Sequence, residues 1–408
     1  MAFLAPLVNV QPQLQGFAFR RRSPVKTWLT APCGGARFHR RCEYSHSQLP
    51  FASPPPETSC TSSFHGIERA HRYSSEADIG STERHVSRHS NMQAAAMTIT
   101  IRRVLFAILG LLACTAYVWQ QIRHFNVEAT AFAALVAIFA VFAISAALYD
   151  WIRKDPCIGS MLFGLGFITI YGATLNVISY FGLTIAGPRI DDFLASVDRA
   201  MGVDWPALMT FMANHPASNL VMYYVYRAST WQTLIFIIIL GRSDRARTVE
   251  QLCLTLVLCG ILTIGTWILF PSFGAIAVYG LPPSIAGHLP IVVDQNYAHR
   301  LVNLLANGPG LISPLTIKGL VGFPSFHTAQ AVIIAWYARR AGVLFYPFLI
   351  FNSLTILSTP IQGGHHVIDV IGGIAAAAFT IWLATIIANR VTITATRKEV
   401  VPALAAAS

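Results

Sequence analysis

Long apolar stretches follow one another from residue 101 almost to the C-terminus, and this pattern constrains the fold more than any other feature. Each stretch is near the roughly 20 residues that an α-helix needs to cross a bilayer. We therefore expect an all-α, polytopic helical membrane protein with about eight transmembrane helices. The predicted spans are residues 104–121, 129–149, 158–182, 219–240, 251–270, 328–349, 346–361 and 369–389. The sixth and seventh overlap, and the break at residues 339–342 (RRAG) predicts that the sixth ends near Ala338 and the seventh starts near Val343.

The charge content supports this class. Only 12% of the residues are charged, about half the roughly 25% that is usual in soluble globular proteins. The formal net charge is +11, and a basic chain can indicate nucleic-acid binding. Here, however, most Lys and Arg residues adjoin apolar stretches, where such residues set membrane orientation. We expect membrane lipids as partners and no nucleic acid; the sequence leaves the oligomeric state open.

The short loops predict the orientation. With eight spans, 12 basic residues fall on one side of the membrane and 5 on the other. The positive-inside rule then puts both termini in the cytoplasm. Two long loops, about 187–218 and 271–326, would face the outer or lumenal side. Apolar residues spaced along the first loop predict short amphipathic helices at the membrane interface.

Residues 1–96 form the first of four predicted segments and show no sustained periodicity. Their Arg, Ser, Pro and His content offers too little apolar surface to form a core, so we expect a disordered extension. The first 42 residues carry basic residues and no acid, as in a transit peptide. The alternative is that translation starts at Met92 or Met97. The other segments are N-terminal transmembrane helices at 97–184, a catalytic region at 185–390 and a cytoplasmic tail at 391–408.

A first histidine motif, GFPSFHT, occupies residues 322–328 at the outer end of the sixth span. Pro324 stops any preceding helix, and Ser325 is a favoured N-cap. A helix N-terminus offers free N–H groups and the positive end of a dipole, which favours an anion. His327 would lie in the first turn beside that anion. An interfacial histidine next to a helix cap would have the same local sequence.

A second motif, GGHHVIDVIGG, occupies residues 363–373 between the seventh and eighth spans. His365 and Asp369 are four residues apart and share a helix face. The carboxylate can hold the imidazole in one tautomer, which leaves the other ring nitrogen as a nucleophile or base. Gly372 and Gly373 would let another helix pack closely. A helix-capping aspartate beside an interfacial histidine is the alternative interpretation.

The two motifs together point to phosphoryl transfer. An even number of crossings puts both on one side of the membrane. One histidine can attack phosphorus while the other protonates the leaving oxygen. The seven cysteines form no CxxC pair and no cluster with histidine, and no Asp/Glu cluster indicates a metal, so we expect neither a metal site nor a cofactor.

PSFH at residues 324–327, followed 38 residues later by HxxxDVxxG at 365–373, resembles the second and third motifs of the type 2 phosphatidic acid phosphatase superfamily. That superfamily also holds the vanadium haloperoxidases. The PSFH and GGHH forms, and the segment DRAMGVDWP at 198–206, are most similar to the branch of inositol phosphorylceramide synthase, an inositolphosphotransferase. The resemblance covers about residues 185–390 and implies a phosphatase-like core of six helices.

The resemblance also implies roles for individual residues. His365 would be the nucleophile that forms a phosphohistidine, and Asp369 would orient it. His327 would be the general acid and then the base for the acceptor. Ser325 would bind phosphoryl oxygens.

The departures from the family pattern concern the phosphate-binding cation. The superfamily often has Ser-Arg shortly before the nucleophilic histidine, where this chain has Ser358 and Thr359, and the Lys-x6-Arg-Pro first motif is absent. Arg227, Arg300 and Lys318 are the candidate replacements. Arg227 lies inside the fourth predicted span, where a charge is costly, although its side chain could snorkel to the interface. Lys318 could equally be a solvated loop lysine.

Neighbouring aromatic residues offer a weaker indication. Tyr223, Tyr224, Tyr226, Trp231 and Gln232 could line a site from the fourth span. An aromatic belt at the membrane interface explains the tyrosines and the tryptophan equally well.

Three functions are consistent with these residues. The first is an integral membrane enzyme that transfers phosphoryl groups from a lipid phosphate or phospholipid, with either water or an alcohol as acceptor. The second is an inactive transporter or scaffold of the same fold, against which the intact His327, His365 and Asp369 argue. The third is a haloperoxidase, which would need the missing arginine.

Overall fold

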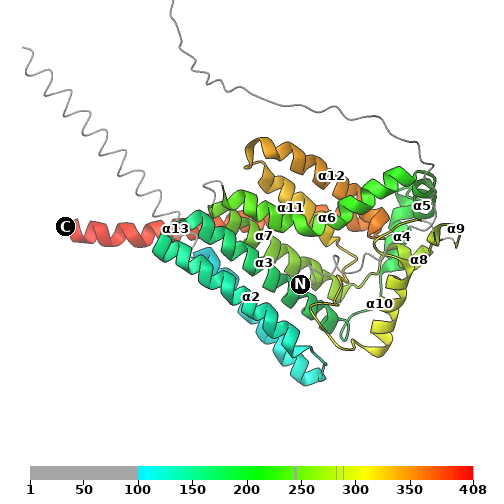
Figure 1. Ribbon diagram of the computed structural model, residues 1–408, viewed down its shortest axis with the longest axis horizontal. Coiled ribbons are helices and arrows are strands. Elements are labelled where there is room, and N and C mark those ends of the chain that lie inside the picture. The colour runs from blue at the N-terminus through cyan, green and yellow to red at the C-terminus, as the bar shows by residue number, and fades with distance from the viewer. Residues whose placement is uncertain (1–99, 243–245, 282, 288, 408) are drawn as a thin grey trace, which may run out of the picture. The chain divides into compact units, whose positions relative to one another are not determined.

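The computed structural model describes residues 100–242, 246–281, 283–287 and 289–407 (Figure 1). The predicted disordered extension at 1–96 lies outside the described residues. Within them the chain is helical, and its only β-type pairing is a single bridge between Val127 and Ile312. The long helices are Thr100–Arg123, α2 (Ala129–Leu148), α3 (Pro156–Gly182), α6 (Pro216–Gly241), α7 (Ala246–Leu269), α11 (Phe326–Ala338), α12 (Phe345–Gln362) and α13 (Val367–Ala407).

Shorter helices fill the two loops that the sequence predicts to face outward. These are α4 (Asp191–Ala200), α5 (Trp205–Asn214), α8 (Ala275–Tyr279), α9 (Pro283–Ala286) and α10 (Gln295–Asn307). In Figure 1 they gather at one end of the bundle of long helices. The amphipathic helices expected in the first loop are α4 and α5. Each buries part of its apolar side, including Leu194 of α4 and Met209 of α5.

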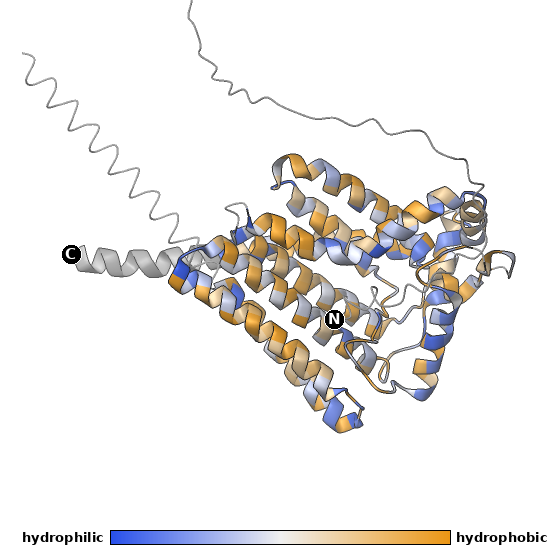
Figure 2. Cartoon of the chain, viewed as in Figure 1, coloured by the Kyte–Doolittle hydropathy of each residue, from blue (hydrophilic) through white to orange (hydrophobic). Residues whose placement is uncertain are grey.

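Six of the described helices are long and apolar enough to cross a membrane. They are Thr100–Arg123, Ala129–Arg153, Pro156–Gly182, Arg247–Leu269, Gly342–Gln362 and Val367–Arg390. Figure 2 shows hydrophobic residues along their length. These helices identify a multi-pass, all-α membrane protein.

Two of the eight predicted spans correspond to helices outside this set of six. The predicted span 328–349 is α11, which ends at Ala338 as expected but has only 13 residues, about 20 Å of helix. The predicted span 219–240 is α6, which carries Arg227 and Gln232 near its middle among its apolar residues. Both helices pack within the bundle, since α11 contacts α7, α12 and α13, and α6 contacts α3 and α12.

Helices α3 and α7 form the centre of the bundle. In each, 61% of the most apolar window is buried, against 11% in α2 and 17% in Thr100–Arg123. The two peripheral helices therefore present apolar surface suited to lipid. Arg102 fastens the first helix to the core, because its guanidinium contacts Asp150 and donates to buried Glu250 at 2.8–3.0 Å and to Ser160 at 2.8 Å.

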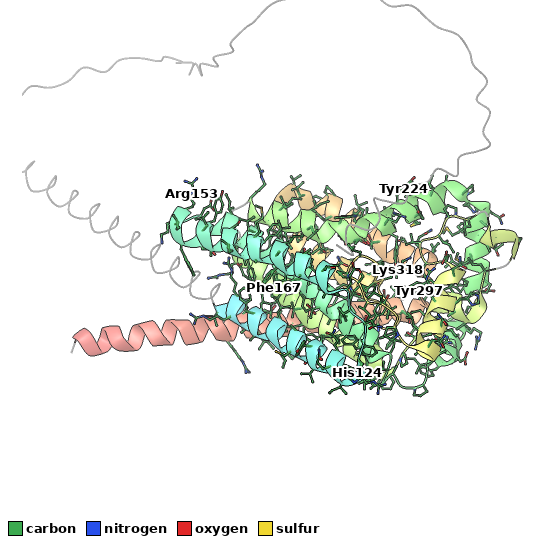
Figure 3. The ribbon with its side chains drawn as sticks, turned by 60° about the horizontal axis from the view of Figure 1, so that its bottom comes forward. His124, Arg153, Phe167, Tyr224, Tyr297 and Lys318 are labelled. Atoms are coloured by element: carbon green, nitrogen blue, oxygen red, sulfur yellow. The ribbon has the colours of Figure 1, made fainter. Side chains whose placement is uncertain are left out.

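Arg153 and the candidate cation Lys318 lie at opposite ends of the bundle (Figure 3). Figure 3 shows Arg153 at one end and Lys318 and Tyr297 at the opposite end. The helix starts that carry the histidine motifs lie at the second end, beside α4 and α8. The end with Arg153 is the one that the sequence predicts to face the cytoplasm.

Candidate active site

The first histidine motif forms the start of α11. Ser325 is the N-cap, and its hydroxyl accepts a hydrogen bond from the N–H of Thr328 at 3.4 Å. Ser325 is fully buried. His327 lies in the first turn and is half-buried. The sequence therefore predicted the helix start correctly.

In the second motif α13 begins at Val367, so His365 lies in the turn before the helix and does not share a helix face with Asp369 as the sequence predicted. Nδ1 of His365 lies 3.1 Å from Oδ2 of Asp369, and the same oxygen accepts the N–H of His366 at 3.0 Å. Asp369 is fully buried, and His365 is 5% exposed. A buried carboxylate held by a backbone donor is a fixed partner for Nδ1, so Nε2 is the ring nitrogen left for chemistry.

The two helix starts are joined directly. The N–H of Ser325 donates to the backbone oxygen of Asp369 at 3.0 Å. A Cβ atom at Gly373 would lie 2.5 Å from the backbone oxygen of Ser325, so this contact requires glycine there. At Gly372 a Cβ would approach the ring of Phe323 to 2.7 Å. The glycine pair permits the close approach that the sequence predicts.

A residue from α4 caps the second motif. The carboxylate of Asp198 accepts the N–H groups of Val367 and Ile368, each at 2.9 Å. Its Oδ2 also lies 3.4 Å from Nδ1 of His366. Asp198 is 1% exposed, so these donors replace the water that an exposed carboxylate would have. Asp198 thus fixes the N-terminus of α13, on which Asp369 stands.

The turn before His365 is held by a glycine pair and a second aspartate. Gly274 has φ +83°, and a Cβ there would overlap the backbone oxygen of Gly364, which accepts the N–H of Ile276 at 3.2 Å. The carboxylate of Asp191 accepts the N–H groups of Phe273 and Gly274 at 2.6 and 2.9 Å. The loop before α8 is therefore locked against the histidine turn.

Tyr226 of α6 contacts His327. Its hydroxyl oxygen lies 3.3 Å from Nδ1 of His327, and the two rings stack with centroids 4.7 Å apart. Tyr226 is 5% exposed. The two histidines therefore have different Nδ1 partners, a carboxylate for His365 and a phenol for His327.

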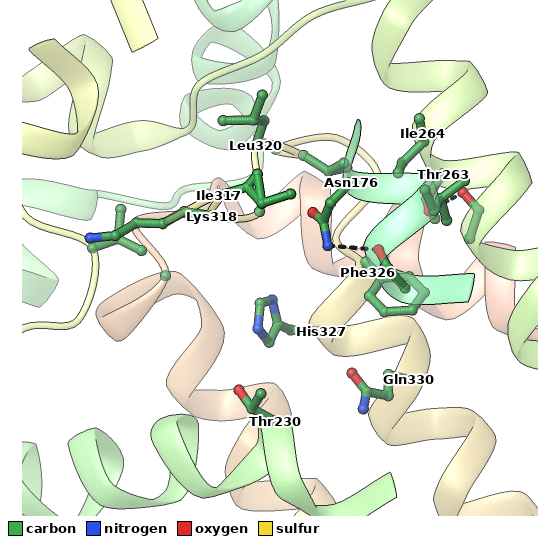
Figure 4. A pocket seen from close by; sticks show the side chains of 18 of the residues that line it. Asn176, Thr230, Thr263, Ile264, Ile317, Lys318, Leu320, Phe326, His327 and Gln330 are labelled. Carbon is green, nitrogen blue, oxygen red and sulfur yellow. Dashed lines mark hydrogen bonds between the residues drawn. The ribbon is translucent and has the colours of Figure 1, made fainter. Parts of the chain in front are cut away.

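His327 and His365 line one pocket with a volume of about 720 Å³ (Figure 4). Its walls come from α3, α6, α7, α10, α11 and the segment 315–322. Many of the lining side chains are apolar, including Ile168, Leu175 and Ile264. Asp369 and Ser325 are not among the lining residues and lie behind the histidines. The pocket can hold an anion at the histidines and apolar groups against α3 and α7.

A part of the chain is similar to a known family. Residues 192–383 match the family model of the PAP2 superfamily. The match includes α4, with Asp198, and both histidine motifs. The comparison with curated proteins gave no match, and neither did the comparison with solved structures.

The three candidate cations that the sequence offers, Arg227, Arg300 and Lys318, all line the pocket. Nη1 of Arg227 donates to the hydroxyl of Tyr223 at 2.9 Å. Arg300 is half exposed, and its guanidinium lies 3.7 Å from the carboxylate of Asp294. Lys318 is exposed, and Figure 4 shows its side chain on the segment opposite α11.

Among the aromatic candidates of the fourth predicted span, only some face the site. Tyr226 lines the pocket, whereas Tyr224 is 63% exposed. Gln232 is buried but does not line the pocket. No local pattern in the sequence marks Asp198 as a cap for a helix 169 residues away; it belongs to the segment 198–206, which carries only the family resemblance. Among the described residues, no group of three or more His, Cys, Asp or Glu side chains could hold a metal ion.

Proposed function

We propose that this chain is an integral membrane enzyme that transfers phosphoryl groups from a lipid phosphate or phospholipid through a phosphohistidine. Proteins of the PAP2 superfamily are in general phosphatases and phosphotransferases. The observation that carries the proposal is that His365, backed by Asp369, and His327 line the same pocket. A nucleophile and an acid at one pocket are the two groups that phosphoryl transfer from an oxygen ester needs.

The reaction has two steps. Nε2 of His365 attacks phosphorus, the bond between phosphorus and the leaving oxygen breaks, and protonated His327 gives its proton to that oxygen. In the second step neutral His327 takes a proton from the acceptor hydroxyl, whose oxygen attacks the phosphohistidine and restores His365. Asp369 holds Nδ1–H of His365 throughout, so the attacking lone pair stays on Nε2.

Charge compensation would come from the cations around the pocket. A phosphoryl group brings negative charge, and Arg227, Arg300 and Lys318 line the same cavity. They are our candidates for binding the phosphoryl group, in place of the arginine that many members of the superfamily have and this chain lacks. Ser325 caps α11, and its role toward phosphoryl oxygens would be to orient the free N–H groups of that helix start.

The apolar side of the pocket supports a lipid as the phosphoryl donor. Ile168, Leu175, Leu256 and Ile264 line it from the two central helices. On α7 the lining residues run from Leu256 to Ile264, so this wall extends about 12 Å along the helix. An acyl chain would bury against it, which favours a lipid phosphate over a small soluble phosphate.

The acceptor is either water or an alcohol. Because the chemistry as far as the phosphohistidine is the same for both, the catalytic residues do not choose between them. The resemblance of residues 198–206 to inositol phosphorylceramide synthase leads us to propose an alcohol acceptor such as inositol. Measuring product release from labelled lipids with and without inositol would separate transferase from phosphatase.

Rapid-quench trapping tests the proposal. We expect purified full-length protein, mixed with labelled lipid phosphates or phospholipids, to give acid-labile phosphoprotein. His365→Ala should abolish it, because the attacking atom is lost. His327→Ala should slow its formation by about 10²–10⁴-fold with an alkyl leaving group. His124→Asn, at an exposed loop position, is the control and should behave as wild type. Equal trapping in wild type and His365→Ala would rule out His365 as nucleophile.

A further inference from the structure

The two histidines at the pocket differ in what holds their Nδ1 atoms. We propose that Tyr226 is a positioning residue for His327, and that a phenol at His327 and a carboxylate at His365 assign the roles of acid and nucleophile. The inference rests on the proposed function and adds a residue that neither histidine motif contains.

The geometry of Tyr226 joins three elements. Its hydroxyl oxygen is 3.3 Å from Nδ1 of His327 on α11, and its ring stacks on the imidazole. A Cβ atom at Gly363 would lie 2.6 Å from this hydroxyl and 2.7 Å from Cδ2 of His365. The phenol therefore lies between the two histidine motifs, in space that only glycine at position 363 leaves open.

The role of general acid determines which ring nitrogens of His327 carry a hydrogen. As an acid, His327 has to be protonated on both nitrogens and to lose its Nε2 proton to the leaving oxygen. Nδ1 keeps its hydrogen before and after that loss, so it needs a hydrogen-bond acceptor in both states. The oxygen of Tyr226 is that acceptor. The phenolic hydrogen then points into the pocket that Tyr226 lines, where a phosphoryl oxygen can accept it.

The chemical nature of the hydrogen-bond acceptor at Nδ1 affects how well His327 can act as an acid. A carboxylate, as at His365, stabilises an imidazolium strongly and makes the other nitrogen more basic. A neutral phenol orients the ring without adding negative charge, so His327 gives up its proton more readily. The same residue type is thus directed to opposite roles by its neighbour.

Other buried tyrosines of the bundle show a different pattern. Tyr171 donates to the backbone oxygen of Val257 at 2.7 Å, and Tyr337 bonds to the hydroxyl of Thr255 at 2.8 Å. Neither touches a titratable partner through these bonds. Tyr337 lies on α11, near the end opposite His327, and serves as a matched control for loss of a buried hydroxyl.

Tyr226→Phe removes the hydroxyl and keeps the stacked ring. We expect phosphohistidine formation from a lipid phosphate with an alkyl leaving group to slow by about 10-fold to 100-fold, less than for loss of the acid itself. A nitrophenyl phosphate ester needs little protonation, so its rate should stay within about twofold of wild type. Tyr337→Phe should leave both rates unchanged. The measurement is rapid-quench trapping with full-length protein, after thermal unfolding has shown that each variant is folded.

The outcomes are distinct. Equal slowing with both leaving groups would mean a packing role and would overturn the inference, as would unchanged rates with both. If Tyr226→Phe does not fold, 3,5-difluorotyrosine at position 226 takes its place; the fluorinated phenol is a weaker acceptor and should slow only the alkyl substrate. If His365→Ala abolishes trapping but Tyr226→Phe affects both leaving groups alike, the proposed function stands and this inference alone is contradicted. Absence of trapping in wild type contradicts it and the proposed function together.

Discussion

At the scale of single residues, the chemistry of each histidine depends on the group that faces its Nδ1 atom. One oxygen of Asp369 receives both Nδ1 of His365 and the N–H of His366, so its lone pairs are committed to the histidine turn. A carboxylate can only accept in this position, which leaves the His365 ring a single tautomer. An amide of the same shape could offer its N–H₂ group instead and stabilise the other tautomer.

Asp369→Asn is therefore expected to leave the fold intact and to impair catalysis. The histidine would be free to carry its hydrogen on Nε2, the attacking atom. The rate of phosphohistidine formation should fall by about 10²–10⁴-fold. Rapid-quench trapping gives the rate, and circular dichroism with thermal unfolding gives the state of the fold. Trapping at the wild-type rate would show that Asp369 does not set the tautomer.

At the scale of elements, the short helix α4 at the pocket end of the bundle supports the starts of other segments. The carboxylate of Asp198 on α4 caps α13, and that of Asp191 at the start of α4 caps the loop before α8. Both are buried, and each accepts two backbone N–H groups. One short helix thus fixes two of the segments that meet at the histidine turn.

Asp198→Asn should disturb the start of α13. The asparagine side chain has one acceptor oxygen where the carboxylate has two, so it can keep only one of the two backbone hydrogen bonds at full strength. Its contact with His366 also loses the negative charge. Hydrogen bonds to charged groups contribute roughly 1.5–3 kcal/mol, so we expect a stability loss of that order together with slower trapping. Asp192→Asn, at the exposed neighbouring acid of α4, should change neither. Identical thermal unfolding of Asp198→Asn and wild type would contradict the capping role.

At the scale of the whole molecule, basic loops and the candidate site lie at opposite ends of the helical bundle. Figure 3 labels Arg153 at one end. Arg102, near the start of the first helix, contacts Asp150 close to Arg153 and donates to Glu250. The far end holds the short helices and the pocket (Figure 1). Positive residues favour the cytoplasmic face, so we predict that both termini are cytoplasmic and that the pocket opens to the outer or lumenal side.

Cysteine labelling tests this orientation. Gly322 and Gly364 lie within the motifs, but a Cβ atom at Gly322 would overlap Ser272 and one at Gly364 would crowd Ile276. Ser196 of α4 and Ala306 of α10 are exposed and accept the change. In a cysteine-free background, an impermeant reagent should label both from the outer or lumenal side and should not reach Arg153→Cys. Labelling of Ser196→Cys only from the cytoplasmic side would reverse the predicted topology.

The sequence by itself determined the membrane class, the helix start at Ser325 and the pairing of His365 with Asp369, although it wrongly put His365 on the helix. These follow from local rules, because apolar length, capping residues and contacts between residues four apart act over a short stretch of chain. The tertiary structure alone decided that Tyr226 faces His327, 101 residues away, and that Asp198 caps a helix 169 residues away. Several tyrosines and acids were equally suitable in sequence. Packing of α4 and α6 against α11 and α13 selected among them, since burial and hydrogen-bond partners depend on contacts that no local pattern records.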